Sequence, residues 1–148
     1  MTILDAKLMF STGQAITTLA DAASEISDYV ADLGTGMKDA WGNAITPDIG
    51  EGGELEVNSV VSVVMVNASA TIEVQLVTKA ADATLTSGGT QLGVKVFPAE
   101  SVAGTRLSFH VPSGAVLRYL GVIYKAVGAE LTSGTFITWL GMDHEKYD

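Results

Sequence analysis

The sequence has no cysteine in its 148 residues. This absence excludes a disulfide framework, a thiolate zinc site and a cysteine nucleophile. Charged residues are also few, at 17% against 47% hydrophobic residues, so the chain is too apolar for intrinsic disorder and can bury a core. No apolar run reaches the roughly 18 residues that a membrane-spanning helix needs. We also expect no secretory signal peptide, because the N-terminus has no basic segment followed by an apolar block.

Positive charge is scarce, and the acidic residues are concentrated in the first part of the chain. The net charge is −9, and residues 1–56 hold ten acidic and two basic residues. We expect no nucleic-acid partner, because binding to phosphates needs a clustered cationic surface. An anionic membrane is disfavoured as a partner on the same grounds. Either solvated loops, the interpretation that we favour, or a docking surface accounts for the acidic part.

Catalytic motifs are also missing. The two histidines, His110 and His144, form neither a His-x-His pair nor a His-Glu-x-x-His motif, and there is no Gly-x-Ser-x-Gly elbow or phosphate-binding loop. The sequence Asp143-His144-Glu145 could hold a metal weakly, but a hydrated C-terminal tail explains it better. We therefore expect no enzyme activity, no metal, no cofactor and no small-molecule substrate.

The chain from residue 54 onward reads as strands separated by turns. Valine-rich and alternating apolar segments favour a pleated strand over a helix. We expect strands over residues 54–67, 72–76, 92–96, 106–111, 116–124 and 135–140. About eight short strands with turns every 8 to 12 residues predict an all-β sandwich or barrel.

The first part of the chain is less regular. Residues 7–11 predict a short strand closed by Thr12-Gly13, and residues 14–27 predict strand or loop, because their threonines and serines oppose a helix. Residues 34–53 contain six glycines and one proline, which predicts a long glycine-rich loop. Trp41 in this loop either anchors it to the body, the interpretation that we favour, or contacts another molecule.

We expect one domain over residues 1–148. Residues 1–53 form its acidic part of strands and loops, residues 54–142 hold the main strands, and residues 143–148 are a polar tail.

Two C-terminal strands are apolar on both faces, which is unusual for a strand with one solvated face. They are 116–124, in which Arg118 is the one apparent exception, and 135–140. Either a second layer of the protein or a partner covers the far face, and we favour a partner for part of it. We expect Arg118 to pair with a carboxylate across the sheet.

The C-terminal third resembles a known family. Its pattern is Pro112-x-Gly114 followed by Arg118-Tyr119-Leu120, then 131–140 and an acidic Asp143. The opening, Leu4 to Ser11 with Gln14-Ala15-Ile16, is similar to the start of the same proteins, whereas Asp39 to Glu54 matches nothing that we can place. Together these segments resemble the Bbp16-like capsid cement (decoration) proteins of tailed bacteriophages.

This resemblance implies a jelly-roll-like antiparallel β-sandwich with an extended N-terminal segment and a long glycine-rich loop. It implies a homodimer, made in the host cytoplasm, that sits on the outer surface of the virion and bridges neighbouring major capsid subunits without enzymatic activity. The family pattern designates no catalytic residue.

Candidate contact residues come from their chemistry alone. For dimer or core packing we nominate Tyr119, Tyr124, Phe136 and Trp139. For capsid contact we nominate Leu8, Phe10 and Trp41. Two other functions compete: a carbohydrate- or receptor-binding jelly-roll module of a head fibre or tail, which exposed loop aromatics favour, and a cupin-like enzyme, which the missing histidine ligands oppose.

Overall fold

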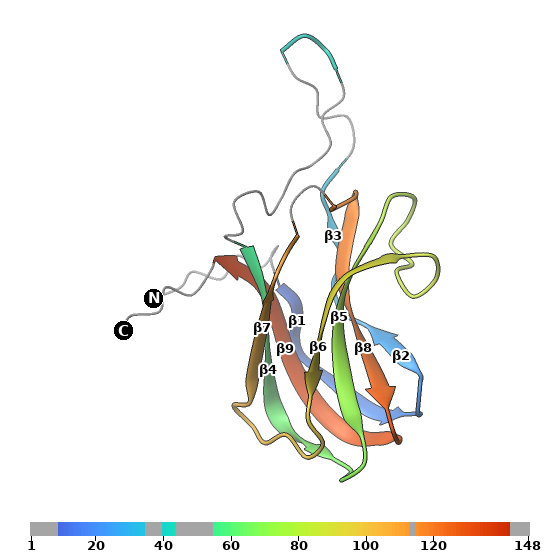
Figure 1. The fold of residues 1–148 in the computed structure, drawn as a ribbon, viewed down its shortest axis with the longest axis vertical. Helices are drawn as coiled ribbons and strands as arrows, with labels where there is room; N and C mark the ends of the chain where they lie inside the picture. The colour runs from blue at the N-terminus through green and yellow to red at the C-terminus, as the bar shows by residue number, and fades with distance from the viewer. Residues whose placement is uncertain (1–8, 35–39, 44–54, 113–114, 143–148) are drawn as a thin grey trace.

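The computed structural model describes residues 9–34, 40–43, 55–112 and 115–142. Every regular element in these ranges is a β-strand (Figure 1). The strands are β1 (Met9–Leu19), β2 (Ser24–Ile26), β3 (Ala31–Asp32), β4 (Leu55–Val66), β5 (Thr71–Lys79), β6 (Thr90–Phe97), β7 (Arg106–His110), β8 (Tyr119–Val127) and β9 (Leu131–Met142). They confirm the all-β prediction.

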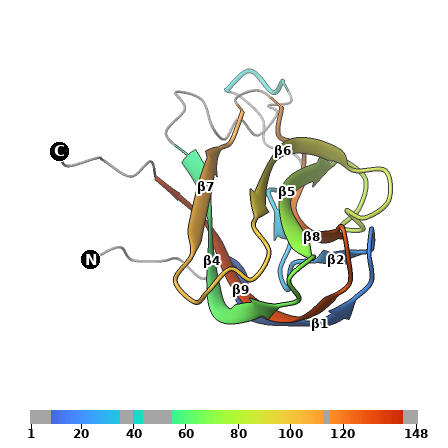
Figure 2. The same cartoon turned by 60° about the horizontal axis from the view of Figure 1, so that its bottom comes forward.

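The strands form two antiparallel sheets that pack face to face. The four-stranded sheet has the order β1-β9-β4-β7, and the five-stranded sheet has the order β2-β8-β5-β6, with β3 also pairing with β8. Figure 2 shows the two sheets curving around a shared interior. Alternate residues of each strand therefore face this interior, as expected for a sandwich.

The strand pairs are nested: the first strand pairs with the last, and each following pair lies closer to the middle of the chain. β1 pairs with β9, β2 and β3 pair with β8, β4 pairs with β7, and β5 pairs with β6. The chain is thus one long hairpin, folded at the β5–β6 connection and rolled up so that it closes two sheets. This is the jelly-roll arrangement, and it confirms the predicted fold.

Strand β1 is longer than predicted. The expected short strand over residues 7–11 would end at Thr12-Gly13, but β1 continues through Gly13 to Leu19. Register shifts between Met9 and Ser11 and between Thr12 and Gln14 accommodate Gly13, whose φ is 120°. The strand continues past Gly13 because these bulges restore its pairing with β9.

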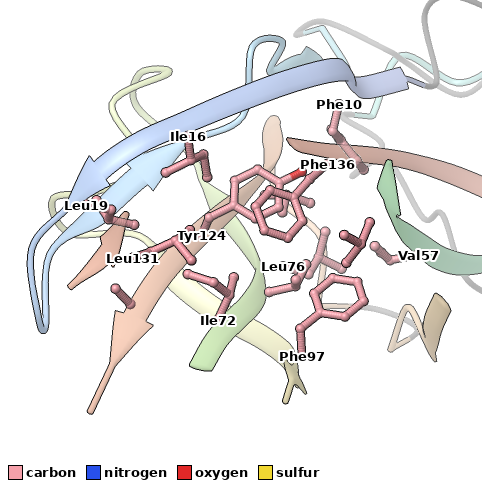
Figure 3. Close-up of a cluster of buried hydrophobic side chains, with 14 of the residues drawn as sticks. Phe10, Ile16, Leu19, Val57, Ile72, Leu76, Phe97, Tyr124, Leu131 and Phe136 are labelled. Carbon is pink, nitrogen blue, oxygen red and sulfur yellow. The ribbon is translucent and has the colours of Figure 1, made fainter. Parts of the chain in front are cut away.

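The core lies between the sheets and is built around two aromatic rings (Figure 3). The Tyr124 ring from β8 stacks on the Phe136 ring from β9, with centroids 5.1 Å apart. The Tyr124 hydroxyl lies 2.9 Å from Ser11 Oγ and 2.6 Å from Thr138 Oγ1, and so links the two sheets. Among the described residues no buried side-chain nitrogen or oxygen lacks a hydrogen-bond partner, as expected for a well-packed interior.

The outer face of β8 is covered by this chain, so the partner that we favoured there is not needed. Ile123 of β8 is buried with Val77 and Leu85 in a second, smaller cluster, and Ile26 and Val30 pack against it. The preference for a partner was wrong for β8, because a sequence pattern does not show that the β5–β6 loop folds back over the sheet.

Candidate interaction surface

The outer face of the four-stranded sheet carries a patch of apolar side chains. Ile137 of β9 lies beside Val60 of β4, and Val63 and Val66 follow along β4. Trp139 is next to Ile137 on the same face of β9 and is half-buried. We call Val60, Val63, Val66, Ile137 and Trp139 the outer patch.

The valines of the outer patch are strongly exposed for their type. Val63 is 54% exposed and Val66 is 46% exposed. Both follow register shifts in the β4–β9 pairing, between Val61 and Val63 and between Val63 and Val66. These bulges end the regular alternation of β4 and turn several valines outward.

The outer patch contains no charged residue. Its neighbours on β1 in the same register are Thr12, Ala15 and Thr17, which are also uncharged. One carboxylate, Glu56, lies farther along the same face of β4, 3.5 Å from His110 Nε2. In a chain with a net charge of −9, a patch without carboxylates is a place where another surface can be buried without desolvating charge.

One cation lies at the edge of the outer patch. The Arg106 guanidinium of β7 sits 5.2 Å from the Trp139 ring centroid, and its Nη2 donates a hydrogen bond to Asn58 Oδ1 at 3.1 Å. Among the described residues Arg106 has no ion-pair partner. Asn58, Arg106, Leu107 and Ser108 line a hollow of about 280 Å³ beside it. Tryptophan and arginine are the residues that most often dominate binding energy at protein interfaces.

The four residues nominated for dimer or core packing divide between two places. Tyr124 and Phe136 are fully buried in the core. Trp139 is half-buried in the outer patch, and Tyr119 is half-buried beside the Leu85 cluster, with the Arg118 guanidinium 4.8 Å from its ring centroid. Of the four, only Trp139 belongs to the outer patch.

The residues nominated for capsid contact fare differently. Phe10 is only 2% exposed and packs in the core, so its nomination was wrong: β1 turns this side chain between the sheets. Trp41 is 86% exposed, which overturns the favoured interpretation that it anchors its loop to the body. Leu8 lies outside the described residues, as does most of the predicted glycine-rich loop.

The predicted partner of Arg118 is present. Arg118 Nε and Nη2 donate to the two carboxylate oxygens of Asp32, at 2.9 and 3.0 Å. Hydrogen bonding to Arg118 lowers the pKa of Asp32 to about 2. This pair ties β3 to the start of β8, so Arg118 has a structural role and is not available to a partner's carboxylate.

Metal ligands do not gather anywhere in the described part of the chain. No group of three or more histidine, aspartate or glutamate side chains occurs there. The cluster Asp143-His144-Glu145 lies outside it. The ranges covered by the structure also contain no helix able to cross a membrane.

The exposed valines of β4 were missed from the sequence. The one available signal is the pair of doubled valines, Val60-Val61 and Val63-Val64, which breaks strict alternation. Doubled apolar residues indicate either a strand buried on both faces or a bulge, and sequence alone does not distinguish these.

Comparison with known proteins supplies the family. A model of the Bbp16 family matches residues 10–140. The chain belongs to the Bbp16 family. This family is phage-related, and the match confirms the resemblance seen in the sequence.

No curated protein matches this Bbp16 family chain. A crystal structure of PirA is similar at a TM-score of 0.44 and 7% identity, covering 89% of this chain and 94% of PirA.

Proposed function

We propose that this Bbp16 family protein is a capsid cement protein. It binds the outside of a tailed-phage head and stabilises the shell by bridging neighbouring major capsid subunits. The outer patch is the observation that supports this proposal most directly, because an uncharged apolar patch on the outer face of a sheet is suited to permanent burial in a phage-related protein. The protein has no enzymatic role in this proposal and needs no cofactor.

In this proposal the outer patch joins two copies of the chain. Each copy carries a net charge of −9, so two copies meet at the lowest electrostatic cost through a surface without carboxylates. The outer patch is such a surface, and Trp139 with Arg106 at its edge supplies the residue types of a binding hot spot. A two-fold axis would place the patch of one copy on the same patch of the other.

Contact with the shell is assigned to the segment that carries Trp41. This side chain is 86% exposed in the connection between β3 and β4. An exposed tryptophan is a strong anchor when a partner supplies a pocket. A dimer carries two such anchors, together with the N-terminal segment that contains Leu8, and can therefore hold two capsid subunits at once.

The stabilisation follows from mass action. A protein that binds the assembled shell and not its separated subunits shifts the equilibrium toward the shell by an amount that grows with its occupancy. Bridging two subunits adds the advantage of linked binding. Many such bridges on each particle would oppose the outward pressure of packaged DNA.

The test compares three forms of the protein on heads that lack it. Wild-type protein should bind saturably and raise the temperature at which the heads break open. Val63→Asp places a charge in the outer patch and should give a monomer that stabilises heads less. Val94→Asp, at a position on β6 that is 41% exposed and outside the patch, should behave as wild type.

Two results would contradict the proposal. One is a wild-type protein that leaves the disruption temperature unchanged at full occupancy. The other is a Val63→Asp variant that sediments and stabilises heads as wild type does, which would remove the outer patch from the mechanism.

A further inference from the structure

A second hollow lies on the outer face of the five-stranded sheet, on the opposite side of the sandwich from the outer patch. It has a volume of about 240 Å³ and sits where the β5–β6 loop rests on the sheet. Its polar lining comes from four strands or their connections, and comprises Ser24, Gln75, Thr86, Gln91 and Lys125. No carboxylate lines it, and Lys125 is its one charged residue.

The floor of this hollow is apolar and closely packed. Val77, Ile123 and Leu85 line it, and all three are buried. The loop backbone lies directly on this floor at Gly89, where an added Cβ would clash with Val77 Cγ1 and lie 2.7 Å from the Leu85 carbonyl oxygen. These three side chains are almost fully covered, so the surface that a ligand would meet in the hollow is mainly polar.

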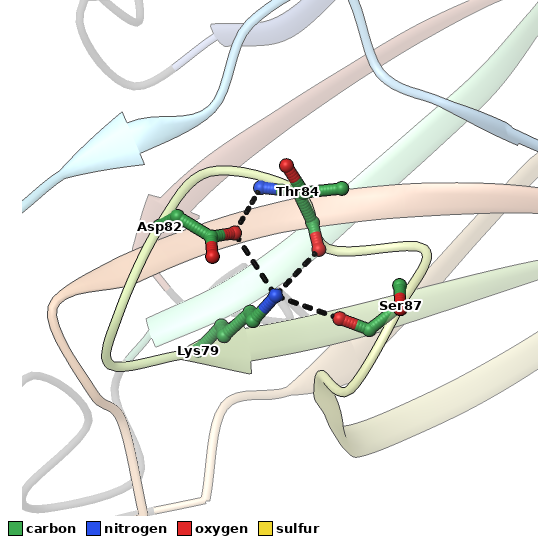
Figure 4. A network of polar contacts seen from close by, with 4 residues as sticks. All are labelled: Lys79, Asp82, Thr84 and Ser87. Atoms are coloured by element: carbon green, nitrogen blue, oxygen red, sulfur yellow. Dashed lines mark hydrogen bonds and ion pairs between the residues drawn. The ribbon is translucent and has the colours of Figure 1, made fainter.

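The β5–β6 loop forms one wall of the hollow, and Lys79, whose side chain is mostly buried, holds it in place (Figure 4). Lys79 Nζ donates to Asp82 Oδ1 at 2.9 Å, to the Ser87 carbonyl at 2.7 Å and to the Thr84 carbonyl at 3.2 Å. Asp82 Oδ1 also accepts a hydrogen bond from the Thr84 amide at 2.8 Å. One ammonium group thus closes the loop, so the wall exists before any ligand arrives, which lowers the entropic cost of binding.

The polar groups of the rim are available for a ligand. Across the described residues the side chains of Ser24, Thr86, Gln91 and Lys125 make no hydrogen bond or ion pair with the protein. Gln75 donates through Nε2 to Glu73 Oε2 at 2.8 Å, which leaves its amide oxygen as an acceptor. Two amides, two hydroxyls and one ammonium around one hollow can bond to several hydroxyls of one small molecule.

We propose that this hollow binds a single sugar ring that carries a carboxylate, such as a hexuronic acid of a polysaccharide. The hydroxyls of a pyranose fit the amides of Gln75 and Gln91. Lys125 supplies the positive charge for the carboxylate. The volume is below the roughly 300–1,000 Å³ of sites for drug-sized ligands, which limits the occupant to one ring.

This inference is independent of the cement role. A dimer formed through the outer patch would leave the outer face of the five-stranded sheet pointing away from the dimer interface. The hollow would then be presented outward, where a particle meets acidic polysaccharides. The sugar-binding test uses the isolated protein, so a protein that fails to stabilise heads could still bind the sugar.

The experiment follows backbone amide signals of the full chain by NMR during titration with glucuronic acid, glucose and glucosamine. Glucuronic acid should give saturable shifts at Gly88, Gly89 and Gln91, with a dissociation constant on the order of 1–10 mM. Glucose should bind more weakly, and glucosamine more weakly still because its ammonium group faces Lys125. Sodium acetate at equal ionic strength serves as the control for a bare carboxylate.

Variants test the assignment of the rim. Gln91→Ala and Lys125→Met should each weaken glucuronic acid binding about fivefold. Lys95→Met, which removes an exposed lysine from the same sheet outside the hollow, should leave binding unchanged. The proposal fails if no sugar gives saturable shifts, if acetate gives the same shifts as glucuronic acid, or if Lys125→Met and Lys95→Met bind equally.

Discussion

Tyr124 of the five-stranded sheet makes hydrogen bonds and a ring contact with residues of the four-stranded sheet. Its ring stacks on Phe136, and its hydroxyl reaches Ser11 on β1 and Thr138 on β9. Burial raises the pKa of Tyr124 to about 12 from the ordinary value of 10.0. The folded chain therefore keeps this proton over a pH range in which the unfolded chain releases it, and stability falls as pH rises between these two values.

We expect Tyr124→Phe to be less stable than wild type by about 1–2 kcal/mol at neutral pH, because two hydrogen bonds are lost. Ser11 and Thr138 keep bonds to Gln14 and Ser59, so neither hydroxyl becomes isolated. The difference should shrink above pH 10, since only wild type has a buried phenol to ionise. Denaturant unfolding at neutral pH and at about pH 11 measures this, and parallel pH profiles would contradict it.

The sequence indicates which aromatic residues make contacts, but it does not show whether their side chains face the core or the outer surface of the sandwich. Tyr124, Phe136 and Phe10 are all aromatic residues in strands, and all three lie in the core. Phe10 was nominated for capsid contact on its chemistry alone, and the bulges near Gly13 that extend its strand depend on pairing with β9. Long-range pairing of this kind leaves no local trace in the sequence.

Among the connecting elements, the turn between β8 and β9 is constrained both by its backbone angle and by a close contact. Gly128 has a φ of +92°, and an added Cβ would lie 2.9 Å from the Ser69 carbonyl oxygen. Its amide donates to Asp21 Oδ1 at 2.9 Å. The turn therefore combines a left-handed backbone with a close approach to another turn, and both features require glycine.

We expect Gly128→Ala to lower the free energy of unfolding by about 2–3 kcal/mol, because backbone strain and a backbone clash add together. Gly104→Ala is the matched control: its φ is +91°, but nothing lies within 4 Å of the added Cβ. It should cost about 1 kcal/mol through strain alone. Thermal unfolding of both variants measures the difference, and equal losses would show that the contact with Ser69 relaxes freely.

Strands with regular alternation were predictable, and short or irregular ones were not. Predicted strands coincide with β4 to β9 to within a few residues, although β8 starts later and β9 earlier than expected. β2 and β3 have three and two residues and exist because β8 offers them a pairing edge. The β5–β6 loop gave only a turn signal, since the packing of Leu85 and the bonding of Lys79 depend on the sheet beneath.

At the scale of the whole molecule, the outer patch makes stability depend on concentration. If two copies bury this surface, dimerisation stabilises the folded state by mass action. The apparent melting temperature of wild type should then rise by several degrees over a roughly 100-fold range of protein concentration. Scanning calorimetry measures this rise.

Val63→Asp should melt at the same temperature at every concentration, since its charge prevents dimerisation while the exposed position tolerates it. Val94→Asp should keep the concentration dependence of wild type. A wild-type melting temperature that stays constant over this range would show that the outer patch does not join two copies.

The jelly-roll pairing also determines when each strand can find its partner during translation. β1 has β9 as its neighbour in the four-stranded sheet, and Met9 pairs with Trp139. Translation at about 5–20 residues per second separates the appearance of these two strands by several seconds. β1 therefore leaves the exit tunnel before β9, and the edge that β9 will occupy stays unpaired during that interval.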